Sequence, residues 1–315
     1  AVEEARTPGV NTTGLLDRLA LAIEEARRPV ATIATVADAV QEAHDYLEKR
    51  IEGNAEGIWT GVSALDNVIG PLFPGRLMII GARPRDGKTS LALNIALNAA
   101  LEQPRGVLFF SAEMPKDQLA LSAIRILGGL DSEALVRGTF SDLQWEEWQH
   151  QCFRLGEAKD HFWIDDSAAI SIESLVPKAL AQARTGKVAL VIVDYVQLLR
   201  TSYRGKKNEQ VAFVTQELKR LARVAGVPVI ALSQITRPSK DGGKHDDEWS
   251  GELEEAADVI LLLGRKAEYE WGSDKAEPDE APRAFKVVKN RHGREGVFTM
   301  IFDKPHLRFR AAETT

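Results

Sequence analysis

The sequence predicts an α/β protein built on a mostly parallel, twisted sheet that is flanked by helices. From Leu77 onward, short apolar runs alternate with helical patterns, which is typical of a parallel sheet covered on both faces. Near the end of the chain, polar and apolar residues alternate, which indicates antiparallel strands at one edge of the sheet. Before residue 58 the sequence is rich in Ala and Glu and shows helical spacing. We therefore divide the chain into a helical linker, residues 1–57, and a sheet domain, residues 58–315.

The linker is predicted to contain two helices, broken at Pro29. Thr13 and Thr35 stand where the hydroxyl of an N-cap residue accepts a hydrogen bond from the first helical turn. The apolar stripe of the first helix either docks on a neighbouring subunit or packs on its own domain, and the pattern alone leaves both open. The apolar positions recur every three or four residues, at Leu15, Leu19 and Ile23 in the first helix and at Val36, Val40, Tyr46 and Leu47 in the second.

The sheet domain is predicted from short apolar runs and from the helical patterns between them. Strands are expected at 77–80, 107–111, 162–165, 189–193, 227–232 and 259–263. Helices are expected at 88–101, 115–128, 141–158, 172–184 and 208–225, the last of them ending at Gly226. Residues 264–282 form an acidic stretch that is predicted as a loop, and alternating segments at 283–288, 297–302 and 307–310 follow it as antiparallel strands.

Composition limits the classes of function. The 315 residues include 46 acidic and 40 basic side chains, a net charge of −6, which argues against nucleic-acid binding over the whole surface. A single cysteine, Cys152, excludes an internal disulfide and a cysteine-based zinc site, and it fits a reducing cytosol. The longest apolar runs fall far short of the ~20 residues of a membrane helix. The first residues, Ala-Val-Glu-Glu, show no secretory signal, so we expect a piece of a longer cytoplasmic protein.

The strongest functional signal is a phosphate-binding pattern between a predicted strand and a predicted helix. Such a loop binds phosphate because backbone N–H groups at the turn and at the helix N-terminus point at the anion. Lys88 adds a positive charge for the β- and γ-phosphates, and the Thr89 hydroxyl is a ligand for Mg²⁺. The pattern departs from its usual form at its first position, where Ala82 stands in place of glycine. The residues assigned to nucleotide binding are Ala82, Arg83, Pro84, Arg85, Asp86, Gly87, Lys88, Thr89 and Ser90.

Three further residues lie at the ends of predicted strands, where they can meet this loop. Asp194 ends the run Val-Ala-Leu-Val-Ile-Val and is the candidate for a second magnesium ligand. Glu113 follows the strand at 107–111 and is the candidate general base, although with Pro115 it also fits the start of the next helix. Gln234 follows the strand at 227–232, where its amide either contacts the γ-phosphate or only caps the strand.

These motifs in this order resemble the motor domain of DnaB-like replicative helicases, within the RecA-like superfamily of P-loop NTPases. The resemblance runs from about Gly57 to Arg310 and rests on six short segments. They are Thr60-Gly-Val-Ser-Ala-Leu-Asp66, Gly81-Ala-Arg-Pro-Arg-Asp-Gly-Lys-Thr89, Ser111-Ala-Glu-Met114, Val193-Asp-Tyr-Val-Gln-Leu-Leu199, Ala231-Leu-Ser-Gln-Ile-Thr-Arg237 and Lys289-Asn-Arg-His-Gly293.

The resemblance implies an ATPase and helicase that requires ATP and Mg²⁺ and unwinds DNA in the 5′–3′ direction. It makes Glu113 the catalytic base, Asp194 the magnesium aspartate and Gln234 the γ-phosphate sensor. It also makes Arg291, with Lys289, a finger that reaches into the ATP site of the neighbouring subunit, which requires a head-to-tail ring, typically a hexamer. Without the family, the simpler interpretation of Arg291 and the basic residues around it is a solvated edge of the sheet.

Single-stranded DNA is the partner that the resemblance implies, and two loops are the candidates to contact it. Basic side chains there can neutralise phosphates without reading bases. The first loop offers Arg200, Arg204, Lys206 and Lys207, and the second offers Arg237, Lys240 and Lys244, with backbone N–H groups at Ser250 and Gly251. Where the family usually has a basic-acidic-Ser-Gly element, this chain has Glu248-Trp-Ser-Gly251, so the usual arginine is absent.

Other functions on the same fold remain as alternatives. A recombinase-like or clock-type ATPase assembles without unwinding duplex, and an assembly switch hydrolyses ATP slowly. Further partners expected from the resemblance are primase and a helicase loader, and no membrane partner is expected.

Overall fold

We describe the fold from a computed structural model of the chain. The structure describes residues 33–52, 57–128, 130, 135, 137–235, 251–265 and 278–312. Within these ranges, no helix is both long enough and apolar enough to cross a membrane.

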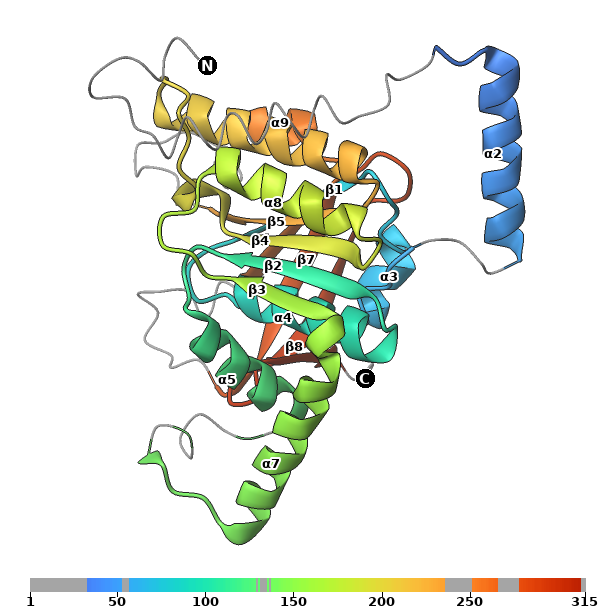
Figure 1. The fold of residues 1–315 in the computed structure, drawn as a ribbon. Coiled ribbons are helices and arrows are strands. Elements are labelled where there is room, and N and C mark those ends of the chain that lie inside the picture. Colours follow the sequence, from blue (N-terminus) through green and yellow to red (C-terminus); the bar gives the residue numbers. More distant parts are fainter. Residues whose placement is uncertain are drawn as a thin grey trace.

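One nine-stranded sheet forms the centre of the described structure (Figure 1). Its strand order is β3-β2-β4-β5-β1-β6-β7-β8-β9. The first six strands in this order pair in parallel, and β7, β8 and β9 add to β6 in antiparallel fashion. The predicted fold class, a mostly parallel sheet with an antiparallel C-terminal edge, is confirmed. The strands are β1 Leu77–Ala82, β2 Gly106–Ser111, β3 Phe162–Asp165, β4 Val188–Asp194, β5 Val229–Gln234, β6 Val259–Arg265, β7 Glu280–Asn290, β8 Gly296–Asp303 and β9 Arg308–Ala311.

Helices cover both faces of the sheet (Figure 1). On one face lie α8 and α9, and on the other lie α3, α4 and α5. The α-helices are α2 Val36–Ile51, α3 Ser63–Ile69, α4 Lys88–Leu97, α5 Lys116–Gly128, α7 Asp142–Glu157, α8 Ile172–Arg184, α9 Lys207–Ala225 and α10 Gly251–Ala256, with a π-helix at Asn98–Glu102 and 3₁₀ turns at Ala158–Asp160 and Val196–Leu198.

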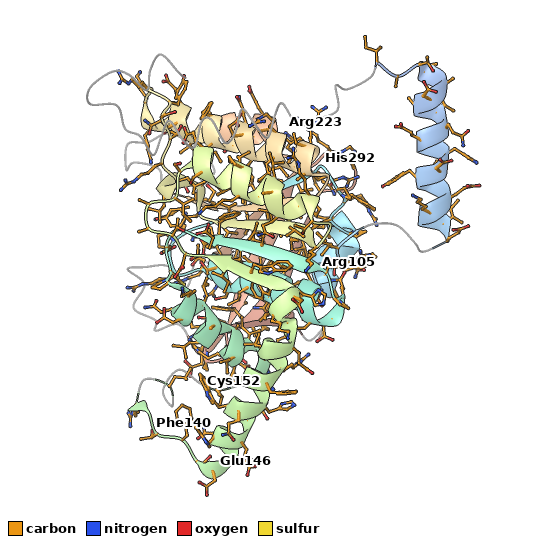
Figure 2. The ribbon with its side chains drawn as sticks, viewed as in Figure 1. Arg105, Phe140, Glu146, Cys152, Arg223 and His292 are labelled. Carbon is orange, nitrogen blue, oxygen red and sulfur yellow. The ribbon has the colours of Figure 1, made fainter. Side chains whose placement is uncertain are left out.

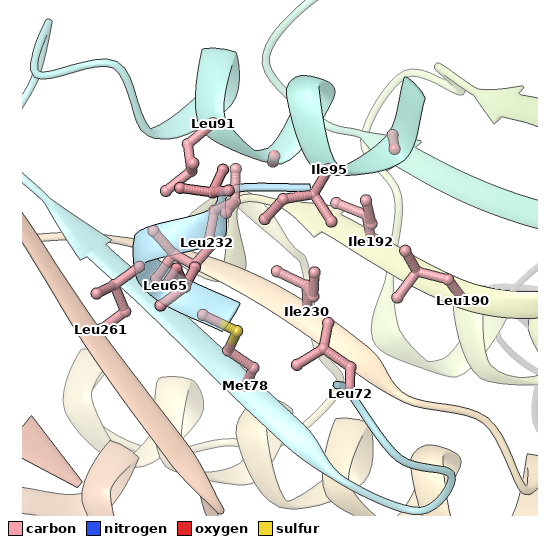
Figure 3. Packing of buried hydrophobic residues seen from close by; sticks show 14 of the residues in the cluster. Leu65, Leu72, Met78, Leu91, Ile95, Leu190, Ile192, Ile230, Leu232 and Leu261 are labelled. Atoms are coloured by element: carbon pink, nitrogen blue, oxygen red, sulfur yellow. The ribbon is translucent and has the colours of Figure 1, made fainter. Parts of the chain in front are cut away.

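The core forms because side chains of each central strand alternate between the two helical layers. In β1, Met78 and Ile80 belong to the cluster under α4, whereas Leu77 and Ile79 belong to the cluster under α8 and α9. Figure 3 shows the first of these clusters, in which side chains of α4 pack over the strands. Burying one such aliphatic side chain contributes about 1.5–3 kcal/mol. Strand β1, which carries the phosphate loop at its end, is therefore fixed from both faces.

The predicted elements are present with small shifts at their ends. The strand expected from residue 227 begins at Val229, and the helix expected at 88–101 is α4 followed by the π-helix. Helix α3 was not predicted, and it is fastened by Asp66, whose carboxylate accepts hydrogen bonds from the Thr60 backbone at 2.9 Å and hydroxyl at 2.7 Å. Asp66 and Thr60 are the ends of the first family segment, so that segment has a structural role.

The loop predicted at residues 264–282 is wrong at both ends. Gly264 and Arg265 continue β6, and residues 280–282 begin β7. Gly264 and Arg265 pair with residues 283–284 of β7, and residues 280–282 pair with residues 301–303 of β8, which extends both strands. The polar, acidic character of this stretch carries no sign of that pairing.

Helix α2 stands to one side of the sheet body (Figure 1). It matches the second predicted linker helix, and Thr35 caps it, because the Asp38 N–H donates to Thr35 Oγ1 at 3.2 Å. Its apolar side chains remain exposed, Val36 to 82% and Leu47 to 53%. The first predicted linker helix, with Thr13 and Pro29, lies outside the described residues.

Helix α7 projects from the sheet body on the side away from α9, and Figure 2 labels Phe140, Glu146 and Cys152 there. Trp145 and Trp148 both lie against Phe140, with ring centroids 6.1 and 6.3 Å from it. These aromatic residues pack locally, as expected for a surface helix.

Candidate nucleotide site

The phosphate loop, residues 82–89, leaves the sheet at the carboxyl end of β1 and enters α4 at Lys88. Gly87 turns the chain in the left-handed region, with φ 97°. A Cβ atom at this position would lie 3.0 Å from Phe309 Cζ and 3.3 Å from Phe302 Cζ. Glycine is therefore required here both by the backbone conformation and by the two rings behind the loop.

Lys88 joins the loop to two neighbouring strands. Its ammonium lies 2.8 Å from Asp194 Oδ1, at the end of β4, and 3.1 Å from Glu113 Oε2, beyond β2. The same nitrogen lies 4.2 Å from the centre of the Tyr195 ring. Lys88 is 8% exposed, and Asp194 is fully buried. The three predicted residues from three separate segments thus meet at one point.

Asp194 is a buried carboxylate that accepts hydrogen bonds from both Lys88 and Thr89. Burial raises the pKa of its carboxyl, while the Lys88 charge and the hydrogen bonds from Lys88 and Thr89 oppose the rise. The nearby Glu113 charge raises this pKa further. A buried carboxylate of this kind needs cations beside it, and Lys88 supplies one in the chain itself.

Thr89 and Asp194 place two oxygen atoms side by side at the phosphate loop. Thr89 Oγ1 donates to Asp194 Oδ2, and the two oxygens are 2.8 Å apart. Adjacent ligands of an octahedral ion with bonds of 2.0–2.1 Å are about 2.9 Å apart. Among the described residues no three His, Cys, Asp or Glu side chains cluster as a metal site. Mg²⁺ does not need such a cluster, because it is usually held by one or two protein oxygens together with phosphates and water.

Glu113 lies on a tight turn that its neighbours hold. Ser111 Oγ accepts from the Met114 N–H at 3.1 Å and donates to the Met114 carbonyl at 2.6 Å. The Ala112 N–H donates to the Asp194 carbonyl at 2.7 Å. The Glu113 side chain is 48% exposed, so it can reach water while it remains near Lys88.

Gln234 ends β5, directly beside the phosphate loop. It pairs with Ala82 of β1, and the next residue, Ile235, donates its N–H to the Ala82 carbonyl at 3.0 Å. On its other side, the backbone of Gln234 is bound by the side chain of Gln197. The structure therefore places this predicted sensor at the loop, between β1 and the turn after β4.

Two arginines from the C-terminal strands hold the outer side of the phosphate loop. Arg265 Nε lies 2.7 Å from Asp86 Oδ1, and its Nη2 donates to the Arg85 carbonyl at 2.9 Å. Arg283, which is fully buried, donates to the Asp86 carbonyl at 3.3 Å and lies over the Phe302 ring. Burial raises the pKa of Asp86, and Arg265 and Arg283 oppose that rise. Strands β6 and β7 thus fix the loop from behind.

Lys289 and Arg291 lie at the opposite end of the parallel strands, where β1 and β6 begin. Lys289 donates to the Glu254 carbonyl, and Arg291 Nη2 donates to the Glu255 carbonyl at 2.8 Å. Arg291 also lies beside the buried Asp258, whose carboxylate accepts from the Leu77 N–H at 2.7 Å. Leu77 begins β1, whereas the phosphate loop follows the end of β1. The start of β1, where Arg291 lies, is therefore about 17 Å along the strand from the phosphate loop. Arg291 cannot reach the phosphate loop of its own chain.

A cavity of about 610 Å³ lies at this end of the strands, beside α2. Its lining includes Tyr46, Phe73 and His292. Burial lowers the pKa of His292, and the charges of Arg76, Lys219 and Arg291 lower it further, while Asp258 opposes them. Figure 2 shows His292 near Arg223, at the end of α9.

The first predicted DNA loop is described, and the second is mostly not. Arg200 and Arg204 are exposed, and Arg200 is fixed by its backbone N–H, which donates to the Ile170 carbonyl at 3.0 Å. Lys206 precedes α9, and Lys207 Nζ donates to the Gln197 carbonyl at 2.8 Å. Arg237, Lys240, Lys244 and Ser250 lie outside the described residues, and Gly251 begins α10.

Sequence reasoning missed Tyr195, Gln197, Asp258, Arg265 and Arg283. Arg265 ends an apolar strand and Asp258 precedes one, which is the signal that identified Asp194. Gln197 and Arg283 carried no such signal, because Gln197 lies within a turn and Arg283 within a strand rather than at the end of one.

Comparison with known proteins agrees with this geometry. The sequence model of the DnaB-like helicase C terminal domain matches residues 57–311. The replicative DNA helicase DnaC of Bacillus subtilis is 30% identical over 293 residues, which are 90% of this chain and 63% of that protein. The chain thus spans less than two thirds of that relative's length.

Solved structures agree as well. One solved ATPase domain superposes with a TM-score of 0.76 and 25% identity, covering 90% of this chain and all of that one. A DnaB-like replicative helicase, from a study of its interactions with primase, superposes with a TM-score of 0.74 and 26% identity, covering 93% of this chain and 70% of that one. The predicted RecA-like architecture is confirmed.

Proposed function

The chain belongs to the family of DnaB-like helicase C-terminal domains, and from this we propose that it is the motor domain of a replicative DNA helicase. ATP is hydrolysed at the subunit interfaces of a homo-oligomeric ring, typically a hexamer, and the ring moves along single-stranded DNA to separate duplex. The 5′–3′ direction follows from the same family relationship. The relatives named above are replicative helicases, which favours unwinding over an ATPase that only assembles.

The observation that carries the proposal is the separation of two functional groups within one chain. The phosphate loop lies at the carboxyl ends of the parallel strands, and Arg291 lies at the opposite edge, beside Asp258. A head-to-tail interface brings opposite faces of identical subunits together and closes into a ring when the rotation permits. Such an interface places Arg291 of one subunit against the phosphate loop of the next. The exposed apolar side chains of α2 supply further surface for contacts between subunits.

At the phosphate loop, the chain neutralises and orients the triphosphate. Backbone N–H groups of the loop and of the N-terminus of α4 face the phosphates, and Lys88 exchanges its carboxylate partners for phosphate oxygens. Thr89 and Asp194 are the residues that hold Mg²⁺, which supplies charge neutralisation between the phosphates when it is bound. Their oxygen spacing of 2.8 Å supports this assignment.

Glu113 is positioned to accept a proton from the attacking water. It is half-exposed and lies next to Lys88, so a water molecule can reach both its carboxylate and the γ-phosphate. Arg291 from the neighbouring subunit, with Lys289, stabilises the charge that develops on the transferred phosphoryl group, an effect worth roughly 10³ to 10⁵ in rate. Gln234 detects the γ-phosphate from its place beside Ala82.

DNA binding is assigned to loops at the same edge of the sheet as the phosphate loop. Arg200, Arg204, Lys206 and Lys207 form the basic part of the first loop, and their contacts are with DNA phosphates rather than bases. The second loop contributes Arg237, Lys240 and Lys244, with Ser250 and Gly251. Primase and a loader are the proposed protein partners, and the cytoplasm is the proposed location.

One experiment tests the proposal directly. ATP turnover of the chain is measured with and without oligothymidine, and strand separation is measured on a forked duplex. We expect stimulation by the oligonucleotide, unwinding of the fork, and loss of both activities in Lys88→Ala. Lys187→Ala, which changes an exposed lysine before β4, is the matched control and should behave like the wild type. ATP hydrolysis that persists in Lys88→Ala would contradict the assignment of ATP hydrolysis to the phosphate loop.

A further inference from the structure

Gln197 binds the backbone of Gln234 through its whole carboxamide. Its Nε2 donates to the Gln234 carbonyl at 3.0 Å and to Ser233 Oγ at 2.9 Å. Its Oε1 accepts from the Gln234 N–H at 3.2 Å. Every donor and acceptor of this side-chain amide except one lone pair is therefore used on two consecutive residues of β5.

These bonds take the place of pairing with β4, which ends before it reaches Gln234. The parallel pairing of β4 with β5 ends at Val193 and Ala231, so Gln234 is not paired with a residue of β4. A carboxamide carries the same donor and acceptor as a peptide group, and the Gln197 side chain fills the ladder position beside Gln234. On the other side of β5, Gln234 pairs with Ala82 of the phosphate loop. Gln234 is thus bound on one side by the strand that carries the phosphate loop and on the other by Gln197.

Gln197 also contacts both ends of the first DNA loop, residues 199–206. It lies in the 3₁₀ turn Val196–Leu198, which directly precedes the loop. Its carbonyl accepts a hydrogen bond from Nζ of Lys207, the residue directly after the loop, at 2.8 Å. Between these ends, Glu173 accepts from the Ser202 N–H at 2.7 Å, and Tyr203 stacks on Phe213 at 5.2 Å. The loop is therefore bound to neighbouring elements, and the Gln197 side chain joins its beginning to β5.

We infer that Gln197 is the positioning residue through which the state of Gln234 reaches the DNA loop at 199–206. This inference rests on the function proposed above and adds a second route to it, because Gln234 also leads directly into the loop that follows β5. Loss of the γ-phosphate shifts Gln234, and Gln197 carries the shift to Lys207 and to the exposed Arg204. Nucleotide and DNA affinities are then linked by one coupling free energy.

The test measures how strongly the bound nucleotide changes the affinity for DNA. Affinity for fluorescent oligothymidine is measured in the presence of ATPγS and of ADP, for the full chain with Mg²⁺. In the wild type we expect the two dissociation constants to differ by at least about fivefold. Gln197→Glu keeps the size of the side chain but cannot donate to the Gln234 carbonyl. We expect its ratio to fall below about twofold, while the affinity for each nucleotide stays within about threefold of the wild type.

Two further variants complete the design. Gln197→Asn stays neutral but is one methylene shorter, so it should lose the coupling even if the partly buried negative charge of Gln197→Glu prevents folding. Gln182→Glu makes the same chemical change on the exposed side of α8 and should keep the wild-type ratio.

The outcomes separate the two claims. A wild-type chain whose DNA affinity is the same in both nucleotides contradicts the proposed function, and the inference with it. A wild-type ratio that persists in both Gln197 variants overturns the inference alone.

Discussion

Asp86 in the phosphate loop is paired with Arg265 at the end of β6, with Arg265 Nε 2.7 Å from Asp86 Oδ1. An acidic side chain inside a phosphate-binding loop repels the anion that the loop binds. Here the carboxylate is 4% exposed and faces away to an arginine that also binds the Arg85 carbonyl. The pair therefore removes an unfavourable charge and fixes the loop backbone at once.

Breaking this pair should destabilise the fold. Arg265→Met leaves the buried Asp86 carboxylate with less compensation, and we expect the free energy of unfolding to fall by about 2–3 kcal/mol. The double variant Asp86→Asn/Arg265→Met should lose less unfolding free energy than the sum of the losses in the two single variants. We expect this difference, the coupling energy, to be at least about 1 kcal/mol. Urea unfolding of the four proteins measures this cycle. Lys178→Met, which breaks the more exposed pair with Asp165, is the control and should cost less than about 1 kcal/mol.

The cost of Arg265→Met should depend on pH. Burial already raises the pKa of Asp86 above its usual value of about 3.9, and loss of Arg265 removes a charge that opposes the rise. A carboxyl with a raised folded pKa contributes stability that is fully present below the unfolded pKa and is lost as pH rises through the folded pKa. Because the folded pKa is higher in the variant, it loses more stability on going to neutral pH. The gap in unfolding free energy should therefore shrink as the pH falls from neutral into the acid range, and a gap that stays constant contradicts this account.

Two glycines should respond in opposite ways to alanine. Gly87→Ala places a methyl group 3.0 Å from Phe309 Cζ at a φ of 97°, and it should cost about 1–3 kcal/mol and weaken nucleotide binding. Gly156, in α7, has no atom within 4 Å of an added Cβ. Gly156→Ala should stabilise the protein by up to about 1 kcal/mol through helix propensity. Thermal unfolding and titration with a fluorescent ATP analogue compare the two.

The finger should act between subunits. Arg291→Ala subunits keep a complete phosphate loop, and Lys88→Ala subunits keep Arg291, so each protein alone should hydrolyse ATP at least 10³-fold more slowly than the wild type, by the rough value of such fingers. Co-expressed in equal amounts, they should recover about a quarter of wild-type turnover, because a quarter of random head-to-tail interfaces join one intact loop to one intact finger.

The control is Arg294→Ala, three residues from Arg291 on the same exposed turn, which should retain turnover by itself. Mixed oligomers that remain inactive argue that Arg291 serves its own chain or the fold.

The sequence predicted most of the fold because the central strands are buried on both faces. A strand such as β4, with Val188 to Val193, must be almost wholly apolar, and its polar end at Asp194 then marks the edge of the sheet. The position of Asp194, Glu113 and Gln234 at strand ends follows from the same logic, since parallel strands end at one edge. Their roles in catalysis stay predictions, as do the domain boundary at residue 58 and the DNA contacts.

What the sequence by itself determined is therefore the parallel core, the antiparallel edge and the place of the loop that is predicted to bind phosphate. Each depends on a local pattern: apolar runs, alternation, or a turn that needs glycine. Only the tertiary structure decided that Arg265 and Arg283 hold that loop, that Gln197 completes β5, and that Arg291 faces away from its own phosphate loop. These are contacts across the sheet between residues 37 to 197 positions apart, and the physical reason is that a side chain carries no local record of the partner that folding brings to it.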